Sequence, residues 1–223
     1  MAVRSFVAFV LVVAFLAGLL LVPAGRMDWI EAWAFVVSYA AFLALFSLWG
    51  LLKDPELMQE RGRVSEDTKA WDRVILAVYT IFLVATFVVA GLDAGRNRWS
   101  LVPAPMKALA WLGLLASASI IFSSVTANTY LSRTARIQDD RGQVVVSTGP
   151  YRFVRHPMYL GITLLFACTP LALGSLWALI PGLIVGLLFV VRTSKEDQMV
   201  RAELAGYADY AKRVRFRLFP GIW

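Results

Sequence analysis

The chain contains a single histidine, His156, and a single cysteine, Cys168. Two residues of these types cannot supply the ligand set of a structural zinc centre, so we expect no metal site. A lone cysteine also excludes an internal disulfide bond. Because Cys168 lies within an apolar run, we interpret it as a packing residue.

Charged residues are also scarce, at 17% of 223 residues, whereas 59% are hydrophobic and the mean hydropathy is +0.67. Soluble domains contain roughly 45–50% apolar residues. The excess comes in blocks, and no long alternation of polar and apolar residues indicates a strand. The sequence therefore predicts an all-α, polytopic transmembrane helical bundle with five to six membrane segments.

The apolar blocks fall at about 5–22, 29–52, 73–92, 105–127, 157–173 and 175–191. At 1.5 Å per residue, the first four can cross a hydrocarbon core of about 30 Å. The last two form a hairpin around Gly174 and Ser175, and we leave open whether its short arms cross fully or only in part. We expect the first block to be a retained helix and not a signal peptide, since no clear cleavage site follows it.

The net charge is +7, and its basic residues flank the apolar blocks. This placement favours contact with membrane lipids over binding of nucleic acid. If the N-terminus is cytoplasmic, 18 of the 22 Lys and Arg residues fall on the cytoplasmic side. We therefore predict a bacterial inner-membrane protein with both termini and its active site in the cytoplasm, and a short surface helix after Asp54.

A polar stretch from Ser147 to Tyr159 holds the only histidine and directly precedes the fifth apolar block. Arg192 and Glu196, four residues apart, lie on one helix face where the sixth block ends. The hairpin brings residues 157 and 191 close together. We therefore predict one cavity between the polar stretch and this helix face.

Each residue also has a simpler interpretation. Arg155, His156 and the tyrosines are typical of the membrane interface, and Arg192 with Glu196 is consistent with a solvated ion pair. Asn128 is typical of a helix–helix contact. The combination favours a site.

The residues Gly149-Pro150-Tyr151, Arg155-His156-Pro157-x-Tyr159 and Glu196-Asp197, with Tyr207-x-x-Tyr210 and the final Pro220-Gly221-Ile222-Trp223, resemble the isoprenylcysteine carboxyl methyltransferase family. The wider resemblance is to membrane phospholipid methyltransferases. It covers residues 128–223, which suggests a cofactor-binding region there and an N-terminal transmembrane region over 1–127. Two positions depart from the family: Gln143 replaces a histidine, and Asp197 replaces a second glutamate.

The resemblance implies that S-adenosyl-L-methionine binds between the start of the hairpin and the helix that leaves it. It implies Arg192 and Glu196 as catalytic residues, with Arg192 facing the methyl acceptor. The cofactor-binding residues that it implies are Gln138, Gln143, Val144, Val145, Val146, Tyr151, His156, Pro157, Met158, Tyr159 and Glu196.

The implied acceptor is a lipid-like or prenylated small molecule that is methylated on a carboxylate. Phospholipid N-methylation is an alternative. Two others are an NADPH-dependent enzyme, because some sterol reductases share the His-Pro-x-Tyr hairpin, and a non-catalytic membrane protein.

Overall fold

The computed structural model describes residues 2–62 and 68–223, and every regular element within them is helical. This confirms the all-α prediction. In chain order the elements are α1 (Ala2–Ala24), α2 (Ile30–Lys53), α3 (Pro55–Gly62), α4 (Ala70–Ala90), the π-helix η1 (Gly91–Asn97), α5 (Ala104–Ala127), the short 3-10 helices η2 (Asp139–Arg141) and η3 (Gly149–Arg152), α6 (Pro157–Leu173), α7 (Leu179–Glu203) and α8 (Tyr207–Arg213).

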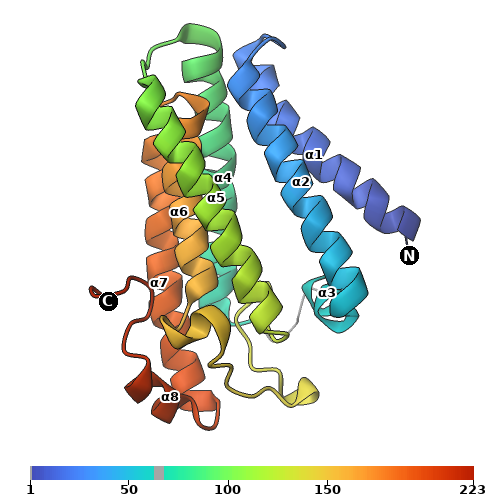
Figure 1. Ribbon diagram of the computed structural model, residues 1–223, viewed down its shortest axis with the longest axis vertical. Helices are drawn as coiled ribbons and strands as arrows, with labels where there is room; N and C mark the ends of the chain where they lie inside the picture. The colour runs from blue at the N-terminus through green and yellow to red at the C-terminus, as the bar shows by residue number, and fades with distance from the viewer. Residues whose placement is uncertain (1, 63–67) are drawn as a thin grey trace.

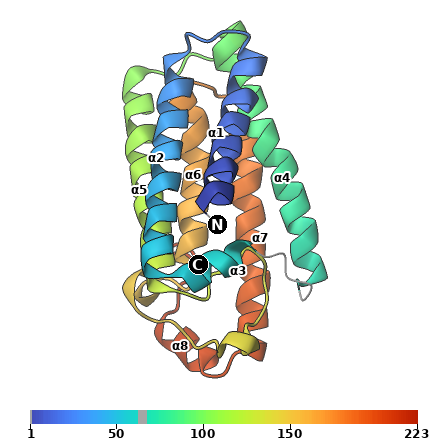
Figure 2. The same ribbon diagram turned by 90° about the vertical axis from the view of Figure 1, so that its right-hand side faces the viewer.

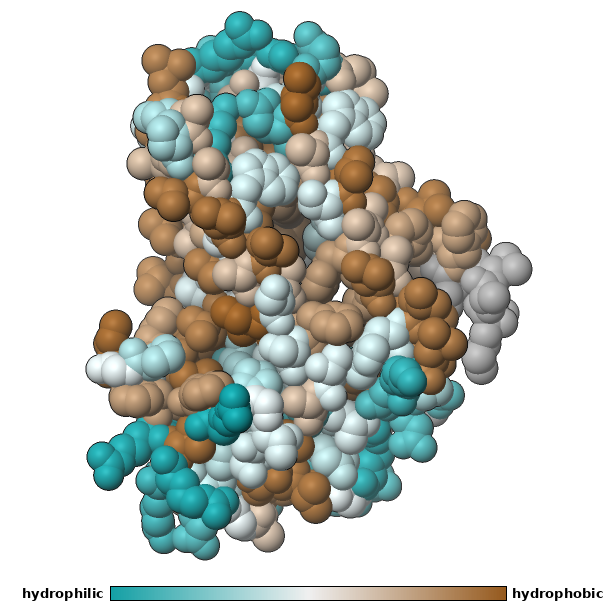
Figure 3. Space-filling model, in the orientation of Figure 1, coloured by the Kyte–Doolittle hydropathy of each residue, from teal (hydrophilic) through white to brown (hydrophobic). Residues whose placement is uncertain are grey.

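Four helical stretches are long and apolar enough to cross a membrane, and they correspond to the first four predicted blocks: Phe6–Ala24, Ile30–Lys53, Ala70–Asn97 and Ala104–Ala127. Helix α6 is also apolar but has only 17 residues. Hydrophobic residues cover much of the middle of the molecule, and hydrophilic ones gather toward its two ends (Figure 3). These features are those of an integral membrane protein.

The helix that carries the sixth apolar block, 175–191, starts later than the block and runs well past its end, because α7 spans Leu179–Glu203. Gly174 ends α6 in a left-handed conformation with φ 85°, and the chain turns before α7 begins. The helix continues into a charged sequence because one of its faces stays buried there, through Arg192, Thr193, Asp197, Met199 and Val200.

The long helices α1, α2, α4, α5, α6 and α7 run alternately in opposite directions (Figures 1 and 2). Helix α3, the connection before α6, and α8 therefore lie at one end, which we call the site end. Helix α3 confirms the short helix expected after Asp54, whose carboxylate accepts the Leu57 N–H at 3.0 Å. The rest of that loop, 63–67, lies outside the described residues, and which side of the membrane the site end faces stays a prediction.

Close backbone contacts hold α6 between α5 and α7. A β-carbon at Gly161 would lie only 2.6 Å from a side-chain carbon of Ile121, and the Ser117 hydroxyl donates to the Gly161 carbonyl at 2.8 Å. On the other side, a β-carbon at Gly182 would lie 2.6 Å from the Phe166 carbonyl oxygen. These contacts fix the direction of α6 and therefore the position of its first turn, which carries the polar motif.

At the opposite end of the bundle, a buried carboxylate fastens the turn between α6 and α7. Asp93 in η1 accepts the hydroxyls of Ser100 and Ser175 at 2.6 Å each, and the Trp177 N–H at 3.3 Å. Ser100 also donates its backbone N–H to Asp93 at 2.8 Å. The hairpin is therefore held at its turn as well as along its arms.

Candidate active site

The site end is hollowed by a cavity that opens to solvent, with about 570 Å³ of empty space when its open mouth is included. Its walls come from the chain before α6, the start of α6, the end of α7, and α8. Nine of the predicted cofactor-binding residues line it: Gln143, Val144, Val145, Val146, Tyr151, His156, Met158, Tyr159 and Glu196.

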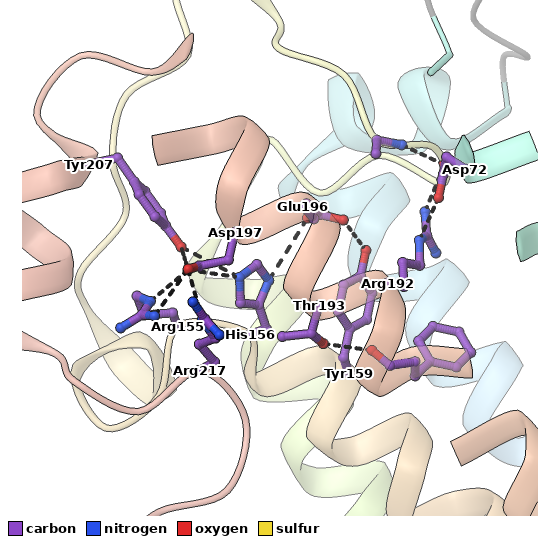
Figure 4. Close-up of polar contacts among 12 residues, drawn as sticks. Asp72, Arg155, His156, Tyr159, Arg192, Thr193, Glu196, Asp197, Tyr207 and Arg217 are labelled. Carbon is purple, nitrogen blue, oxygen red and sulfur yellow. Dashed lines mark hydrogen bonds and ion pairs between the residues drawn. The ribbon is translucent and has the colours of Figure 1, made fainter. Parts of the chain in front are cut away.

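An aromatic wall with a carboxylate beside it forms one side of this cavity. The rings of His156 and Tyr159 stack with centroids 5.8 Å apart and planes 7° from parallel. The Tyr159 hydroxyl donates to Glu196 Oε2 at 2.5 Å (Figure 4). Pro157 begins α6, as the sequence predicts, because its missing N–H costs nothing in a first helical turn. The wall offers aromatic faces and negative charge to a ligand that is planar or cationic.

Behind the aromatic wall, Asp197 joins four separate parts of the chain (Figure 4). Arg155 donates to both oxygens of its carboxylate, at 2.7 and 3.1 Å, and Arg217 donates at 3.0 Å. Tyr207 donates its hydroxyl at 2.9 Å, and His156 Nε2 lies 3.5 Å away. The carboxylate is completely buried, so this cluster fixes the chain before α6 and α8 against the end of α7.

The pKa of Asp197 shows which effect dominates in this cluster. Burial raises the pKa of a carboxyl group, but the hydrogen bonds from His156 and Arg155 outweigh it and hold the pKa of Asp197 well below its usual range. Burial together with the neighbouring Asp197 charge raises the pKa of Tyr207, which therefore stays a hydroxyl donor. Asp197 is an anion at neutral pH.

The hydroxyl of Tyr151 is an unsatisfied polar group in the cavity wall. The Tyr151 hydroxyl is buried and makes no hydrogen bond of good geometry within the part of the chain that the structure describes, although the side chain of Asn128 lies beside it. Its backbone is held in place, because Tyr210 donates its hydroxyl to the Tyr151 carbonyl at 2.6 Å. Burial raises the pKa of Tyr151, so the group stays protonated and can donate. An unpaired buried hydroxyl is costly, so its position in the wall points to a ligand that accepts its hydrogen bond.

The substitution Tyr151→Phe is expected to weaken binding of the cavity's ligand by roughly 2- to 10-fold, the worth of one hydrogen bond, without lowering the stability of the ligand-free protein. Isothermal titration calorimetry and thermal unfolding in detergent measure the two effects. Tyr210→Phe is the control: it removes a hydroxyl that bonds the protein itself and should lower stability. If Tyr151→Phe lowers stability and leaves affinity unchanged, its hydroxyl has no role in binding.

Arg192 does not take part in the ion pair considered from sequence. Its guanidinium pairs instead with Asp72 of α4, with Nε 2.8 Å from Oδ1 and Nη2 3.1 Å from Oδ2. It is buried, lies 5.1 Å from the centre of the Tyr159 ring, and is not among the residues that line the cavity. The simpler interpretation of Arg192 and Glu196 as a solvated pair is therefore wrong, since Glu196 bonds Tyr159. Whether Arg192 acts on the acceptor stays a prediction.

Gln138 and Pro157 also differ from their expected positions. Gln138 is buried, and its side-chain amide is used internally: it donates to the Tyr130 carbonyl and accepts from Arg141 at 2.7 Å. Neither Gln138 nor Pro157 lines the cavity. Gln138 supports the loop, because its backbone N–H and carbonyl both bond Gln143, and Pro157 sets the start of α6.

Asn128 is a cavity residue that the sequence interpretation assigned to helix packing. It ends α5 and lines the cavity, and its side-chain oxygen accepts the Tyr130 N–H at 2.9 Å. The only sequence signal for this role is that an asparagine stands where an apolar helix ends, next to the loop that carries the motif. Asn128 is therefore added to the candidate ligand contacts.

Arg61 of α3 lies next to the cavity wall, on the side toward α2, but does not itself line the cavity. It donates to the carbonyl of Leu131, a cavity residue, at 3.2 Å, and lies 5.6 Å over the Phe46 ring. No carboxylate pairs with it within residues 2–62 and 68–223. Burial, and then the like charge of Arg133, lower the pKa of this guanidinium. An anion beside Arg61 would relieve both effects.

The fold and the cavity together define an integral membrane helical protein with a candidate small-molecule site at one end of its bundle. Residues 107–204, from α5 to the end of α7, match the family described as phospholipid methyltransferase. This range contains the whole polar motif together with Arg192 and Glu196. The resemblance to the wider group of membrane methyltransferases is thereby confirmed, whereas the isoprenylcysteine subgroup stays a prediction.

A relative with a recorded role is the cobalt-zinc-cadmium resistance protein CzcN of Cupriavidus metallidurans. It is 32% identical to this chain over 137 residues, which are 59% of this chain and 58% of the relative. The alignment thus leaves more than a third of the relative unmatched, and the likeness concerns only the shared part.

Proposed function

We propose that this protein is an S-adenosyl-L-methionine-dependent methyltransferase that methylates a carboxylate of a lipid-like or prenylated acceptor. One observation carries the proposal: Tyr151, His156, Tyr159 and Glu196 enclose a single cavity, and all four belong to the segment that matches the methyltransferase family. The cavity lies at the end of apolar helices, where an amphiphile in the bilayer can present its head group.

The residues of the cavity fit this cofactor. The peptide groups of 144–146 have no hydrogen-bond partners in the described part of the chain, so they are available to an adenine or a ribose. The unpaired Tyr151 hydroxyl suits the carboxylate of the cofactor's amino-acid end, and Glu196 suits its ammonium group or a ribose hydroxyl. The stacked rings of His156 and Tyr159 offer a face to a cation.

When bound, S-adenosylmethionine supplies a methyl group activated by a positively charged sulfonium. The contribution of the chain is to hold the acceptor in line with that group and to exclude water. Glu196, placed beside the aromatic wall, favours positive charge in the cavity. Asp197 acts only through others, by holding Arg155, His156 and Tyr207 in position.

The acceptor side favours an anion. Arg61 has no carboxylate partner among the described residues. Arg192 lies behind Tyr159, and Asp72 is its only carboxylate partner among those residues. A carboxylate acceptor is already charged at neutral pH, so its methylation needs no general base. A reaction without a general base agrees with the site, because Glu196 is hydrogen-bonded to Tyr159 and His156 is the one histidine among the lining residues.

A second candidate is phospholipid N-methylation, and the short Tyr159–Glu196 hydrogen bond is the observation that favours it. An amine must lose its proton before it can accept a methyl group, and a carboxylate linked to a phenol can take that proton. In either case we place the site in the cytoplasm, on the basis that 18 of the 22 Lys and Arg residues of the sequence fall on the cytoplasmic side if the N-terminus is cytoplasmic.

Calorimetry on the detergent-purified protein tests the class of enzyme. S-adenosylhomocysteine is expected to bind and NADPH is not. Binding of NADPH alone would indicate the reductase, and binding of neither would indicate a non-catalytic protein.

Incubation of lipid extracts with methyl-labelled cofactor then tests the acceptor. Mild base releases the methyl group of a methyl ester as volatile methanol, whereas an N-methyl group stays on the non-volatile head group. We expect lipid-bound label that base converts to volatile methanol, and label that stays non-volatile would favour N-methylation.

A further inference from the structure

A second hollow, which we call the basic pocket, lies on the outer side of the Asp197 cluster. It has a volume of about 780 Å³ and opens widely to solvent between the end of α7, α8 and the last residues of the chain. Its lining includes Arg201, Lys212, Arg215, Arg217, Ile222 and Trp223. None of these six lines the cofactor cavity, and the two hollows adjoin at Arg155, which lines both.

Its positive charge is only partly balanced. Arg217 and Arg201 share one oxygen of Asp197, at 3.0 and 3.6 Å, and that carboxylate is already bound by Arg155. Lys212 has an exposed partner in Asp209. Arg215 is exposed and forms no ion pair within the described chain. The pocket therefore holds an excess of positive charge and is complementary to an anion.

The surface of α7 leads from the membrane into this pocket. Ile180, Leu183, Leu187 and Val191 are large apolar residues exposed along one side of the helix. Arg201 follows Leu183 by five helical turns of 3.6 residues and so lies on the same face. A lipid whose acyl chains lie along this face would have its head group on the side of α7 that carries Arg201, which lies ten residues beyond Val191.

The rim of the pocket is suited to the membrane interface. Arg217 lies 5.1 Å over the ring of Trp223, and the Trp223 carbonyl accepts the backbone N–H groups of Leu218 and Phe219 at 3.0 and 3.1 Å. This folded tail leaves Ile222 83% exposed at the edge of a basic hollow. Aromatic rings and basic side chains are typical of the head-group layer, where an exposed isoleucine can contact the first carbons of a lipid.

We propose that the basic pocket binds the phosphodiester head group of an anionic phospholipid, with its acyl chains against the exposed face of α7. The chemistry that it recognises is a phosphate anion attached to an apolar group. Free phosphate shares the anion, but it gains nothing from the apolar face of α7 or from Ile222. The proposal does not depend on methyl transfer, and its test does not use that reaction.

The test measures binding of short-chain phosphatidylglycerol and phosphatidylcholine to the detergent-purified protein by native mass spectrometry. We expect a clear preference for phosphatidylglycerol. The double variant Lys212→Gln/Arg215→Gln should weaken its binding about 5-fold for each charge removed. The matched control Arg152→Gln/Arg213→Gln removes two exposed basic residues of the site end that do not line the pocket, and it should leave binding unchanged.

Three results would overturn the proposal: equal binding of the two lipids, an equal loss in the control variant, or displacement of phosphatidylglycerol by inorganic phosphate at the same concentration. The first removes selectivity for an anion, the second reduces the effect to the general charge of the site end, and the third makes the ligand a free anion. Ile222→Ser gives an independent measure, because it keeps all the charges and should still weaken binding of the lipid.

Discussion

Replacing Asp197 with alanine is expected to lower the free energy of unfolding by about 3–5 kcal/mol, the cost of removing one partner of a buried ion pair. Its carboxylate is completely buried and binds Arg155 at 2.7 and 3.1 Å, Arg217 at 3.0 Å and Tyr207 at 2.9 Å. Without it the Arg155 guanidinium, which is 3% exposed, loses its carboxylate partner and is left with neutral ones such as the carbonyls of Val214 and Arg215. Unfolding in detergent, followed by circular dichroism, measures the loss.

Asp209→Ala is the matched control, because this carboxylate is exposed and pairs only with Lys212 on the surface. Little change is expected there. If the two variants lose similar stability, the Asp197 cluster does not hold the site together.

Acid provides a second readout of the same contacts. The pKa of Asp197 is lowered in the folded protein, so its stabilising contribution is complete above about pH 4 and is lost as the pH falls below that value. The difference in stability between the wild type and Asp197→Asn should therefore shrink in acid.

The substitution Glu196→Gln is expected to lower kcat/KM for methyl transfer by roughly 10²- to 10³-fold while leaving the fold intact. Glu196 lines the cavity and is 20% exposed, and its bond to Tyr159 is the only hydrogen bond of its side chain in the described chain. Glutamine keeps the shape and can still accept that bond, so the variant isolates the negative charge. Steady-state assays with labelled cofactor, together with calorimetry, separate a loss of cofactor binding from a loss of turnover.

Glu203→Gln is the control, because it removes a carboxylate from the same helix, where Glu203 pairs with Lys69 at 3.0 Å on the surface and does not line the cavity. Its activity should match the wild type. Wild-type rates in Glu196→Gln would exclude a role for this charge in catalysis and would remove the residue from the site.

Part of the site was predictable because its residues are neighbours in sequence. Tyr151, His156 and Tyr159 fall in one short polar stretch, and they still share a wall once α6 begins at Pro157. Glu196 was predictable through the hairpin, because two antiparallel helices joined by a short turn return the chain to its starting level. In both cases local rules were sufficient.

Other parts were not predictable, because they depend on which helices are neighbours. The ion pair of Asp72 with Arg192 joins α4 to α7, two helices that are far apart in the sequence. The placement of Arg61 near the cavity depends on where α3 lies relative to the bundle. The continuation of α7 to Glu203 depends on a buried face that other segments create.

The sequence by itself determined the membrane helices, their alternating directions and the stretch that carries the chemistry. Hydrophobicity, helix length and turn residues act over a few neighbouring positions, so a single chain is enough to show them. Only the tertiary structure decided which polar groups pair. Asp197 pairs with Arg155 and Asp72 with Arg192, whereas the Tyr151 hydroxyl makes no hydrogen bond of good geometry among the described residues. Electrostatic and hydrogen-bond energies depend on distances of a few ångströms between residues far apart in sequence, and packing alone sets those distances.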